Sequence, residues 1–401
     1  MEQPMNDLDV IPTSDALAGR RIDVIVSGSI AAVESVKFIR ALRRLGAEVT
    51  PWLSHGGATF ITPLAVTWAA GRDAVTGFSG NASHIAMSDA VIVAPASSSV
   101  LAKMARGMTD SHCTALLASA LGQSKPVLIL PSMHDSLLAA PAMCEHLAKI
   151  SSWKNVSILN ARTEEGKQKF PDPAQLADDV SHIMNRPSRP KAGVLVTMGT
   201  TRGYIDDVRY ISNYSSGTLG SLISEELYRQ GFATYVVSGP CERKPTSATT
   251  LKNVLTTGDM LAACTEAETQ GLVGGIFCAS VLDYEPSERS TGKIKSGRPH
   301  LSISFKPTPK IIDLISLAGL TKIGFKLEVG LSESQAEEIA NEYIKKYNLT
   351  MLIANELSAI SASKHHAYAF SKNTPNTTLN SKAEIAQHIC HHLAQQTTLH
   401  A

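Results

Sequence analysis

The sequence predicts an α/β protein of two domains, each built on a doubly wound, Rossmann-like parallel sheet. The chain has 401 residues, which is more than one hydrophobic core usually serves, so two folded units are expected. Short β-rich apolar runs alternate with helical stretches, as is typical of parallel strands joined by crossover helices. This alternation stops at the proline-rich and basic segment NRPSRPKA and then begins again, which indicates a linker.

The first half contains five runs with the length and composition of buried strands. They are IDVIVS (22–27), AEVTPWLS (47–54), DAVIVAPAS (89–97), PVLILPS (126–132) and NVSILNA (155–161). We expect a first domain over residues 21–184. Residues 1–20 are acidic and polar at the start and lack the order of a signal peptide, so we expect a disordered leader there.

The second half contains six such runs, and SESQAEEIANEYIKKY (332–347) is its clearest helix. We expect a linker over residues 185–192 and a second domain over 193–401. No fixed-period repeat relates the two halves, which excludes a solenoid. The predicted strands are GVLVTMG (193–199), TYVVSGP (234–240), GGIFCAS (274–280), HLSISF (300–305), KIGFKLE (322–328) and TMLIANE (350–356).

Charge and composition exclude several classes of protein. The formal net charge is +1, so no broad attraction to nucleic acid is expected, and anions must be bound by local groups. No apolar run is long enough to span a bilayer. The six cysteines are scattered without a zinc or disulfide spacing, which favours a cytoplasmic protein.

A phosphate site is predicted where the first strand turns into its helix. The turn contains Gly28, Ser29 and Ile30, and such a turn presents backbone amides and a positive helix end to an anion. It is not GxGxxG, which argues against a nicotinamide dinucleotide. After a later strand, Ser97, Ser98 and Ser99 open another helix. Both features have a second interpretation, since such turns also serve packing and such hydroxyls serve N-capping.

Together these segments resemble the flavin-binding family of cysteine decarboxylases. Its pattern of GxIAA, a hydroxyl after the second strand, one histidine, PASANT and PxMN is matched by Gly28 to Ala32, Ser54, His84, Pro95 to Ser99, and Pro131 with Met133. The resemblance implies a flavodoxin-like flavoprotein domain that binds FMN, with His84 acting on the substrate. The residues it assigns to FMN are Gly28, Ser29, Ile30, Ser54, Ala96, Ser97, Ser98 and Ser99.

Two departures from this family bear on its chemistry. The asparagine that holds the substrate carboxylate is His134 here, which leaves substrate recognition open at that position. The family also carries a proton-donating cysteine on a flap, whereas this chain has no cysteine between Cys144 and Cys241. The return of electrons from the flavin would therefore lack its usual acid. His134 is either a replacement acid or a packed or solvated residue.

The second domain opens with a loop rich in glycine and hydroxyl groups, TMGTTRGYIDDVRYISNYSSGTLG. Glycines between a strand and a helix suit a loop that approaches a phosphate chain closely. No GKS or GKT follows, so this is not a Walker loop. Farther along, Asp283 ends a buried strand and Lys293 lies in a polar loop. By themselves these two residues also fit an ordinary solvated loop.

From about Gly193 to Asn376 the chain resembles the phosphopantothenate-cysteine ligase domain, through TMGTT, VRYISNYSSGTLG, CASVLDY, KIK, GFKLE and IAN. The resemblance implies that CTP or ATP activates a carboxylate with Mg2+ present, and that cysteine then opens the acyl-nucleotide. Asn213 and Lys293 would be catalytic, although no metal-ligating residue is assigned. The resemblance places Gly199, Arg209, Ser215, Gly217, Gly220, Ala279, Ser280, Asp283, Phe325 and Asn355, together with His134 of the first domain, at nucleotide or substrate.

Some of these positions keep a second interpretation. Phe325 suits core packing equally well, and Arg209 either supports the loop or pairs with Asp206 or Asp207. TPK stands where bacterial members read NPD, and FKLEV where they read FAAET, so the choice between CTP and ATP stays open. A C-terminal group of His388, Cys390, His391 and His392 is interpreted as a polar helix end, since no further zinc ligand is evident.

With both domains in this order, the chain resembles the bifunctional phosphopantothenoylcysteine decarboxylase and phosphopantothenate-cysteine ligase family of coenzyme A biosynthesis. The partners this implies are the small molecules phosphopantothenate and cysteine and a second copy of the chain, with no nucleic acid and no membrane. Two alternatives remain. One is a ligase with a vestigial flavin domain, and the other is a flavoprotein without catalytic activity that regulates a partner.

Overall fold

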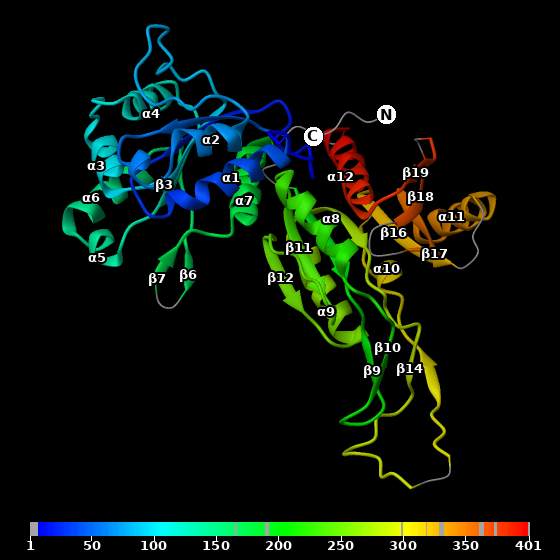
Figure 1. Ribbon diagram of the computed structural model, residues 1–401. Coiled ribbons are helices and arrows are strands. Elements are labelled where there is room, and N and C mark those ends of the chain that lie inside the picture. Colours follow the sequence, from blue (N-terminus) through cyan, green and yellow to red (C-terminus); the bar gives the residue numbers. More distant parts are fainter. Residues whose placement is uncertain are drawn as a thin grey trace. The chain divides into compact units, whose positions relative to one another are not determined.

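The structure, a computed structural model, describes residues 7–164, 167–188, 192–297, 300–317, 319–328, 333–360, 365–372 and 375–399. Its residues form two compact units, Met1–Met184 and Asn185–Ala401. Each unit is an α/β fold around one main sheet (Figure 1).

Unit 1 is built on a five-stranded parallel sheet of order β2-β1-β3-β4-β5. The five predicted strands all lie in this sheet, in the order of a flavodoxin-like fold, which confirms the predicted fold class. The chain order reverses between β1 and β3, so this is the topological switch point. The strands are β1 (Arg21–Val26), β2 (Glu48–Leu53), β3 (Ala90–Ala96), β4 (Val127–Pro131) and β5 (Val156–Ile158).

Helices cover both faces of this sheet because its strands are apolar on both sides. On β3, Ile92 and Ala94 belong to one buried cluster and Val91 and Val93 to the other, as the two-residue period of a strand requires. The helices are α1 (Ala32–Arg44), α2 (Pro63–Ala70), α3 (Ser98–Arg106), α4 (His112–Gly122), α5 (Asp135–Leu138), α6 (Pro141–Ser151) and α7 (Pro173–Asn185), with the short turn η1 (Gly57–Thr59) and the hairpin β6 (Arg162–Glu164) and β7 (Lys167–Lys169).

The expectation of a disordered leader is wrong for the residues just before β1. Leu17 is fully buried in the first core cluster. The Thr13 amide donates to the Arg44 carbonyl over 2.8 Å, and the Leu17 amide donates to the Leu45 carbonyl over 2.8 Å. One apolar side chain and two satisfied amides are enough to fix this segment against the end of α1. Residues 1–6 of the expected leader lie outside the described residues.

The predicted linker begins as ordered structure. Asn185 ends α7, and the short helical turn η2 (Arg186–Ser188) follows it. Asn185 Nδ2 donates to the Arg229 carbonyl over 2.9 Å, and Arg186 Nη1 donates to the Gly231 carbonyl over 3.2 Å. Residues 189–191 of the predicted linker lie outside the described part of the chain.

Unit 2 is built on an eight-stranded sheet of order β12-β11-β8-β13-β16-β17-β18-β19. Its first six strands are parallel and follow the order 3-2-1-4-5-6 of a Rossmann sheet. The switch point therefore lies between β8 and β13. The six strands are β8 (Gly193–Met198), β11 (Ala233–Ser238), β12 (Thr250–Asn253), β13 (Leu272–Phe277), β16 (Thr321–Glu328) and β17 (Met351–Ile360).

Two details of this sheet differ from the predicted one. The strands β18 (His365–Ser371) and β19 (Thr377–Leu379) extend it in antiparallel fashion. The predicted strand HLSISF is not part of it, because its last residue instead opens a short strand of a separate two-stranded sheet. The helices around the main sheet are α8 (Thr218–Arg229), α9 (Thr257–Glu268), α10 (Ile311–Leu314), α11 (Glu333–Tyr347) and α12 (Lys382–Leu399).

Two short antiparallel pairs form an extension that we call the arm, comprising residues 202–212, 284–297 and 300–307. Figure 1 shows its strands running away from the main sheet of unit 2. The pairs are β9 (Arg202–Tyr204) with β10 (Tyr210–Ser212), and β14 (Tyr284–Pro286) with β15 (Phe305–Pro307). Within the described residues, we find no helix with the length and apolar character that crossing a membrane requires.

Candidate active sites

A cavity of about 620 Å³ opens at the switch point of unit 2, within the usual size range of small-ligand sites. It lies where the carboxyl ends of β8, β13 and β16 meet, the expected place for a ligand in such a sheet. Ten residues predicted from the sequence line it: Gly199, Asn213, Ser215, Gly217, Gly220, Ala279, Ser280, Asp283, Phe325 and Asn355. The structure thus brings them together, and their individual roles stay predictions.

Two glycines of this cavity are required by close backbone contacts. Gly217 has φ of +75°, and a Cβ added there would lie 2.5 Å from the Arg243 carbonyl oxygen. Gly199 has φ of +73°, and its Cβ would lie 2.5 Å from the Gly239 carbonyl oxygen. Gly217 also precedes α8 without any N-cap side chain. The Thr218 amide donates to Ser216 Oγ over 3.4 Å, and the next amides of that helix, at Leu219 and Gly220, lie at the cavity without a side-chain acceptor. This is the geometry that favours a bound phosphate.

Gly220 is required to be a glycine for a different reason. It lies inside α8, and a Cβ there would lie 2.5 Å from the Met198 side chain. The glycine therefore lets α8 pack closely against β8. Phe325 is half-buried against the core cluster of this face and also lines the cavity, so it serves core packing, and its contact with a nucleotide or substrate stays a prediction.

Asn213 connects the two loops that close the cavity. Its Nδ2 donates to the Ser280 carbonyl over 3.3 Å and to the Val281 carbonyl over 3.1 Å. The Ser280 amide in turn donates to the Gly199 carbonyl over 2.8 Å. With Nδ2 engaged in this way, Oδ1 is the atom of Asn213 that remains for a ligand.

Several cationic and aromatic residues of the cavity were missed in the sequence. They are Lys310, Lys326, Tyr343, Tyr347 and Lys382. Lys310 forms an ion pair with Asp283. Lys326 lies 5.1 Å from the centre of the Tyr343 ring and pairs with Glu328 over 3.0 Å. The lysine of TPK, noted in the sequence only as a departure, was the one available signal for Lys310.

Cys278 also lines the cavity. Burial raises the pKa of its thiol to about 12. The side chain is therefore a neutral thiol at physiological pH and contributes packing rather than a thiolate nucleophile.

Arg209 and Lys293 do not line this cavity, so one chain does not bring Lys293 together with Asn213, the other residue predicted to be catalytic. Both residues lie on the arm. Arg209 Nη1 donates to Asp206 over 2.8 Å and to the Ile294 carbonyl over 3.3 Å. The pairing with Asp206 is one of the two roles predicted for Arg209, and the contact with Ile294 links it to the segment that carries Lys293.

The backbone on either side of Lys293 is held by two neighbouring carboxylates. The Gly292 amide donates to Asp207 over 2.7 Å, and the Ile294 amide donates to Asp206 over 3.0 Å. The Lys293 side chain itself is exposed. The arm thus presents an ammonium group to solvent on a fixed stretch of backbone.

In unit 1, the two predicted flavin loops meet at the switch point between β1 and β3. Ser27 joins them, since its Oγ donates to the Pro95 carbonyl over 2.8 Å and accepts from the Ser97 amide over 2.8 Å. The loop after β2 packs against the same turn, where a Cβ on Gly28 would lie 3.1 Å from the Gly56 backbone. Ser54 shapes this loop by accepting from the Gly57 amide over 3.0 Å.

These loops fit a phosphate-bearing flavin. The helices α1 and α3 both begin here, and neither has a side-chain cap, whereas Thr62, Ser111 and Thr256 cap α2, α4 and α9. The first amides of α1 donate to the Ser29, Ile30 and Ala31 carbonyls, so the start of α3 is the helix end that offers its amides to an anion at this switch point. Ile30 beside them is 72% exposed, which leaves an apolar surface for a flat ring to cover. Ser29 lies in the turn after β1, Ala96 ends β3, and Ser98 and Ser99 begin α3.

His84 lies in the loop before β3, where its Nδ1 is buried and has no hydrogen-bond partner in the described structure. The Phe78 ring contacts both His84, at 5.9 Å between centres, and His112, at 6.4 Å. His112 also stacks on Trp52 and bonds to the Leu53 carbonyl over 3.1 Å. A buried nitrogen without a partner is costly, and a ligand at the ends of these strands would supply one.

His134 makes a local structural contact, and its role at the substrate stays a prediction. It precedes the short helix α5, and its Nδ1 accepts from the Ser136 amide over 3.3 Å. The flap expected after β5 is the hairpin of β6 and β7, whose residues 165 and 166 are not described. No group of three potential metal ligands is found in the described parts of the chain, the histidines of α12 included. Among those histidines, burial and then its neighbour His388 lower the pKa of His392.

The two units define a class of protein. A family model described as "Flavoprotein" matches residues 10–185, and one described as "DNA/pantothenate metabolism flavoprotein C-terminal domain" matches residues 190–397. The chain is therefore a flavoprotein domain joined to a pantothenate-metabolism domain. Of curated proteins, the bifunctional coenzyme A biosynthesis protein CoaBC of Thermococcus kodakarensis is 33% identical over 94% of this chain and 95% of its own length.

The chain belongs to this CoaBC family, as predicted from the sequence. The Haemophilus influenzae member is 27% identical over 95% of this chain and 98% of its own length. A solved structure described as the DNA/pantothenate metabolism flavoprotein from Streptococcus pneumoniae is 30% identical. It covers 51% of this chain and 99% of its own, with a TM-score of 0.47.

Proposed function

We propose that unit 2 joins 4'-phosphopantothenate to cysteine at the expense of CTP or ATP. The observation that supports this most is the switch-point cavity, which gathers ten residues that motif comparison assigns to nucleotide and substrate. Its uncapped helix end at Gly217 and its lysines suit a polyphosphate.

The reaction has two steps. A carboxylate oxygen of phosphopantothenate attacks the α-phosphorus of the nucleotide, and the bond to pyrophosphate breaks. The cysteine amine then attacks the acyl carbonyl, loses a proton and expels the nucleoside monophosphate. Asn213 Oδ1 faces the substrate, and a lysine ammonium stabilises the negative charge that develops in both steps.

Mg2+ is proposed to accompany the nucleotide, where it would neutralise part of the negative charge of the phosphates. Asp283 is the one acidic side chain among the described residues that line the cavity, and it is paired with Lys310. The protein therefore offers few oxygen ligands of its own, and the phosphates would provide most of them.

We further propose that Lys293 reaches the cavity of a second copy of the chain. The support is its exposed position on the arm and its absence from the cavity lined by Asn213. Mixing Asn213→Ala with Lys293→Gln subunits tests this, because a hybrid can combine one intact Lys293 with one intact Asn213. Recovery of about a quarter of the parental rate is expected, and no recovery would indicate that each chain uses its own lysine.

Unit 1 is proposed to bind FMN and to decarboxylate the ligated product. Bound FMN supplies a two-electron acceptor that eases the loss of CO2 and then returns the electrons. The Ser27-linked loops would hold its phosphate, and His84 would face the substrate through its buried Nδ1. The six free cysteines fit a reducing, cytoplasmic location for the whole enzyme.

A second candidate function is a ligase whose flavin domain has lost its activity. It is favoured by the lack of any cysteine between Cys144 and Cys241, which leaves the hairpin of β6 and β7 without the usual acid. Purified protein incubated with phosphopantothenate, cysteine and either nucleotide decides between the two. Release of both pyrophosphate and CO2 supports both activities, and release of pyrophosphate alone supports the second candidate. If the protein releases neither product, the proposal is contradicted.

A further inference from the structure

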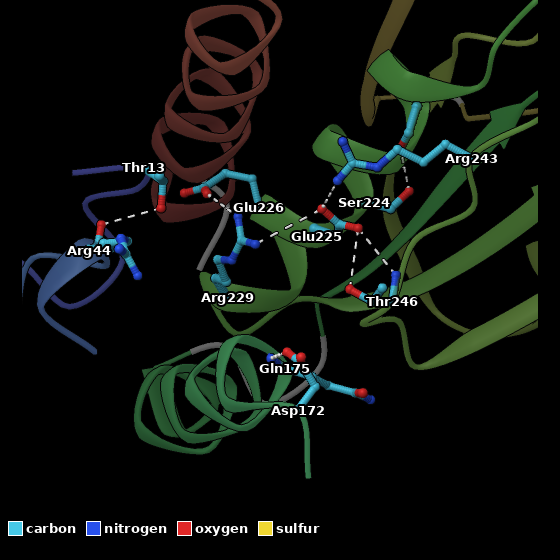
Figure 2. Close-up of polar contacts among 11 residues, drawn as sticks. Thr13, Arg44, Asp172, Gln175, Ser224, Glu225, Glu226, Arg229, Arg243 and Thr246 are labelled. Atoms are coloured by element: carbon cyan, nitrogen blue, oxygen red, sulfur yellow. Dashed lines mark hydrogen bonds and ion pairs between the residues drawn. The ribbon is translucent and has the colours of Figure 1, made fainter. Parts of the chain in front are cut away.

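An unusual buried carboxylate lies behind the nucleotide loop of unit 2. Glu225 lies in α8 and is 2% exposed. Its Oε2 accepts from Arg243 Nη2 over 2.9 Å, and its Oε1 accepts from the Thr246 amide over 3.2 Å (Figure 2). Arg229 approaches the same carboxylate to 4.0 Å. A buried charge is costly unless it is bonded on most sides, as this one is.

These contacts hold the segment that follows β11. The Arg243 amide donates to the Ser216 carbonyl over 2.9 Å, and the Arg243 carbonyl accepts from Ser221 Oγ over 3.1 Å. This carbonyl is also the atom that a Cβ at Gly217 would approach to 2.5 Å. The backbone of Arg243 therefore packs directly against the turn that opens α8, on the side away from the cavity.

We propose that Glu225, through its ion pair with Arg243, is a positioning residue for the nucleotide. Neither residue lines the cavity, so neither is placed to touch the ligand. The pair fixes the 243–246 segment, this segment fixes the Gly217 turn, and the turn presents the amides of α8 to a phosphate. The inference rests on the proposed nucleotide-dependent function of unit 2.

Glu225→Gln tests the proposal, and Glu226→Gln is its matched control. Glu226 is the next residue of α8, is also 2% exposed, and bonds to Arg229 and Gln230 of its own chain segment. Both variants replace one buried carboxylate by an amide of nearly the same shape. They differ in that Glu225 holds the 243–246 segment.

Two measurements are made on the full-length protein. Amide exchange of residues 216–220 and 243–246 should be about tenfold faster in Glu225→Gln and unchanged in Glu226→Gln. The KM for CTP or ATP should rise about tenfold in Glu225→Gln, with kcat changed less than twofold. Arg243→Lys should also have a higher KM for the nucleotide than the parental protein, because a lysine cannot reproduce the forked contact of an arginine.

The outcomes separate this inference from the proposed function. If the parental protein releases pyrophosphate and Glu225→Gln keeps the parental KM, the positioning role is contradicted and the ligase function stands. Unchanged exchange of the two segments also contradicts the positioning role, whatever the activity. Failure of the parental protein to bind or turn over either nucleotide contradicts the proposed function, and with it this inference.

Discussion

The side-chain amide of Asn213 donates to the main-chain carbonyl of Val281 over 3.1 Å. This hydrogen bond, with the parallel one to Ser280, connects the loop after β10 to the loop after β13. Residues nearly seventy positions apart thereby form one wall of the cavity. The site is thus assembled by the sheet and closed by Asn213.

Asn213→Ala should therefore lower the ligase kcat about a hundredfold, the size expected for a lost polar group at a reacting centre. The stability of unit 2 should fall by about 1–2 kcal/mol, because two modest hydrogen bonds are lost. Initial rates and urea unfolding measure the two effects. Asn341→Ala, at an exposed position of α11, is the control and should leave kcat within about twofold. An equal loss of kcat in both variants would show that the effect is not specific to the cavity.

Gly217→Ala should abolish nucleotide binding at concentrations that saturate the parental protein. The new Cβ would lie 2.5 Å from the Arg243 carbonyl, at a φ of +75°, so the turn must move. Gly271→Ala is a matched control, since Gly271 has φ of +66° but no atom within 4 Å of its Cβ position. The control should lose about 1 kcal/mol of stability from backbone strain and keep its nucleotide affinity, as measured by calorimetric titration. Retained affinity in Gly217→Ala would refute the role of this turn.

Asp206→Asn should release the part of the arm that carries Lys293. Burial raises the pKa of Asp206, but the amides of Ile294, Val208 and Arg209 and the Arg209 charge lower it more, so the pKa lies below its ordinary 3.8. A carboxyl with a lowered pKa stabilises the folded form fully above its unfolded value and loses that effect as the pH falls through the folded value. Amide exchange of Ile294 should be about tenfold faster than in the parental protein at neutral pH, and this difference should narrow below pH 3.8.

The same variant should lower kcat while the KM for the nucleotide stays unchanged, because the cavity itself is not altered. Asp259→Asn is its control, since the pKa of Asp259 is also lowered, chiefly by the Thr256 amide, but Asp259 caps α9 and does not hold the backbone around Lys293. If the two substitutions changed the amide exchange of Ile294 equally, the claim that Asp206 holds the backbone next to Lys293 would be contradicted.

Ser27→Ala should weaken FMN binding about tenfold, since the hydroxyl that joins the two flavin loops is lost. Ser35→Ala removes a fully buried hydroxyl that donates to the Ala94 carbonyl over 3.0 Å but does not join the loops. Fluorescence titration of FMN onto apoprotein compares them. Equal affinities in the two variants would argue against the loop junction as the flavin site.

The fold and the cavity lining were predictable because both depend on local sequence signals. Strand-length apolar runs mark β8 and β13, and the glycine and hydroxyl residues that follow them must meet at one sheet edge once the strands pair. Asn213, Gly217 and Ser280 therefore reach the cavity as expected. The antiparallel strands β18 and β19 were missed because their sequences, HHAYAFS and TTL, carry a weaker apolar pattern than the parallel strands.

Other features depend on distant contacts and leave no local pattern. The path of the arm, and with it the position of Lys293, is set by Asp206 and Asp207 binding backbone amides more than eighty residues later. The order of the segment around Leu17 likewise depends on one apolar side chain meeting α1. Lys326 lies within β16, a strand of ordinary composition, and its place in the cavity appears only when β16 pairs with its neighbours in the sheet.

The central claim is that the unit 2 cavity activates the carboxylate of phosphopantothenate with a nucleotide. Exchange of labelled pyrophosphate into CTP or ATP, measured with phosphopantothenate present and cysteine omitted, tests this step alone. We expect label in one of the nucleotides at a rate that depends on phosphopantothenate and is lost in Asn213→Ala. Absence of exchange with both nucleotides, or exchange that proceeds equally well without phosphopantothenate, would contradict the claim.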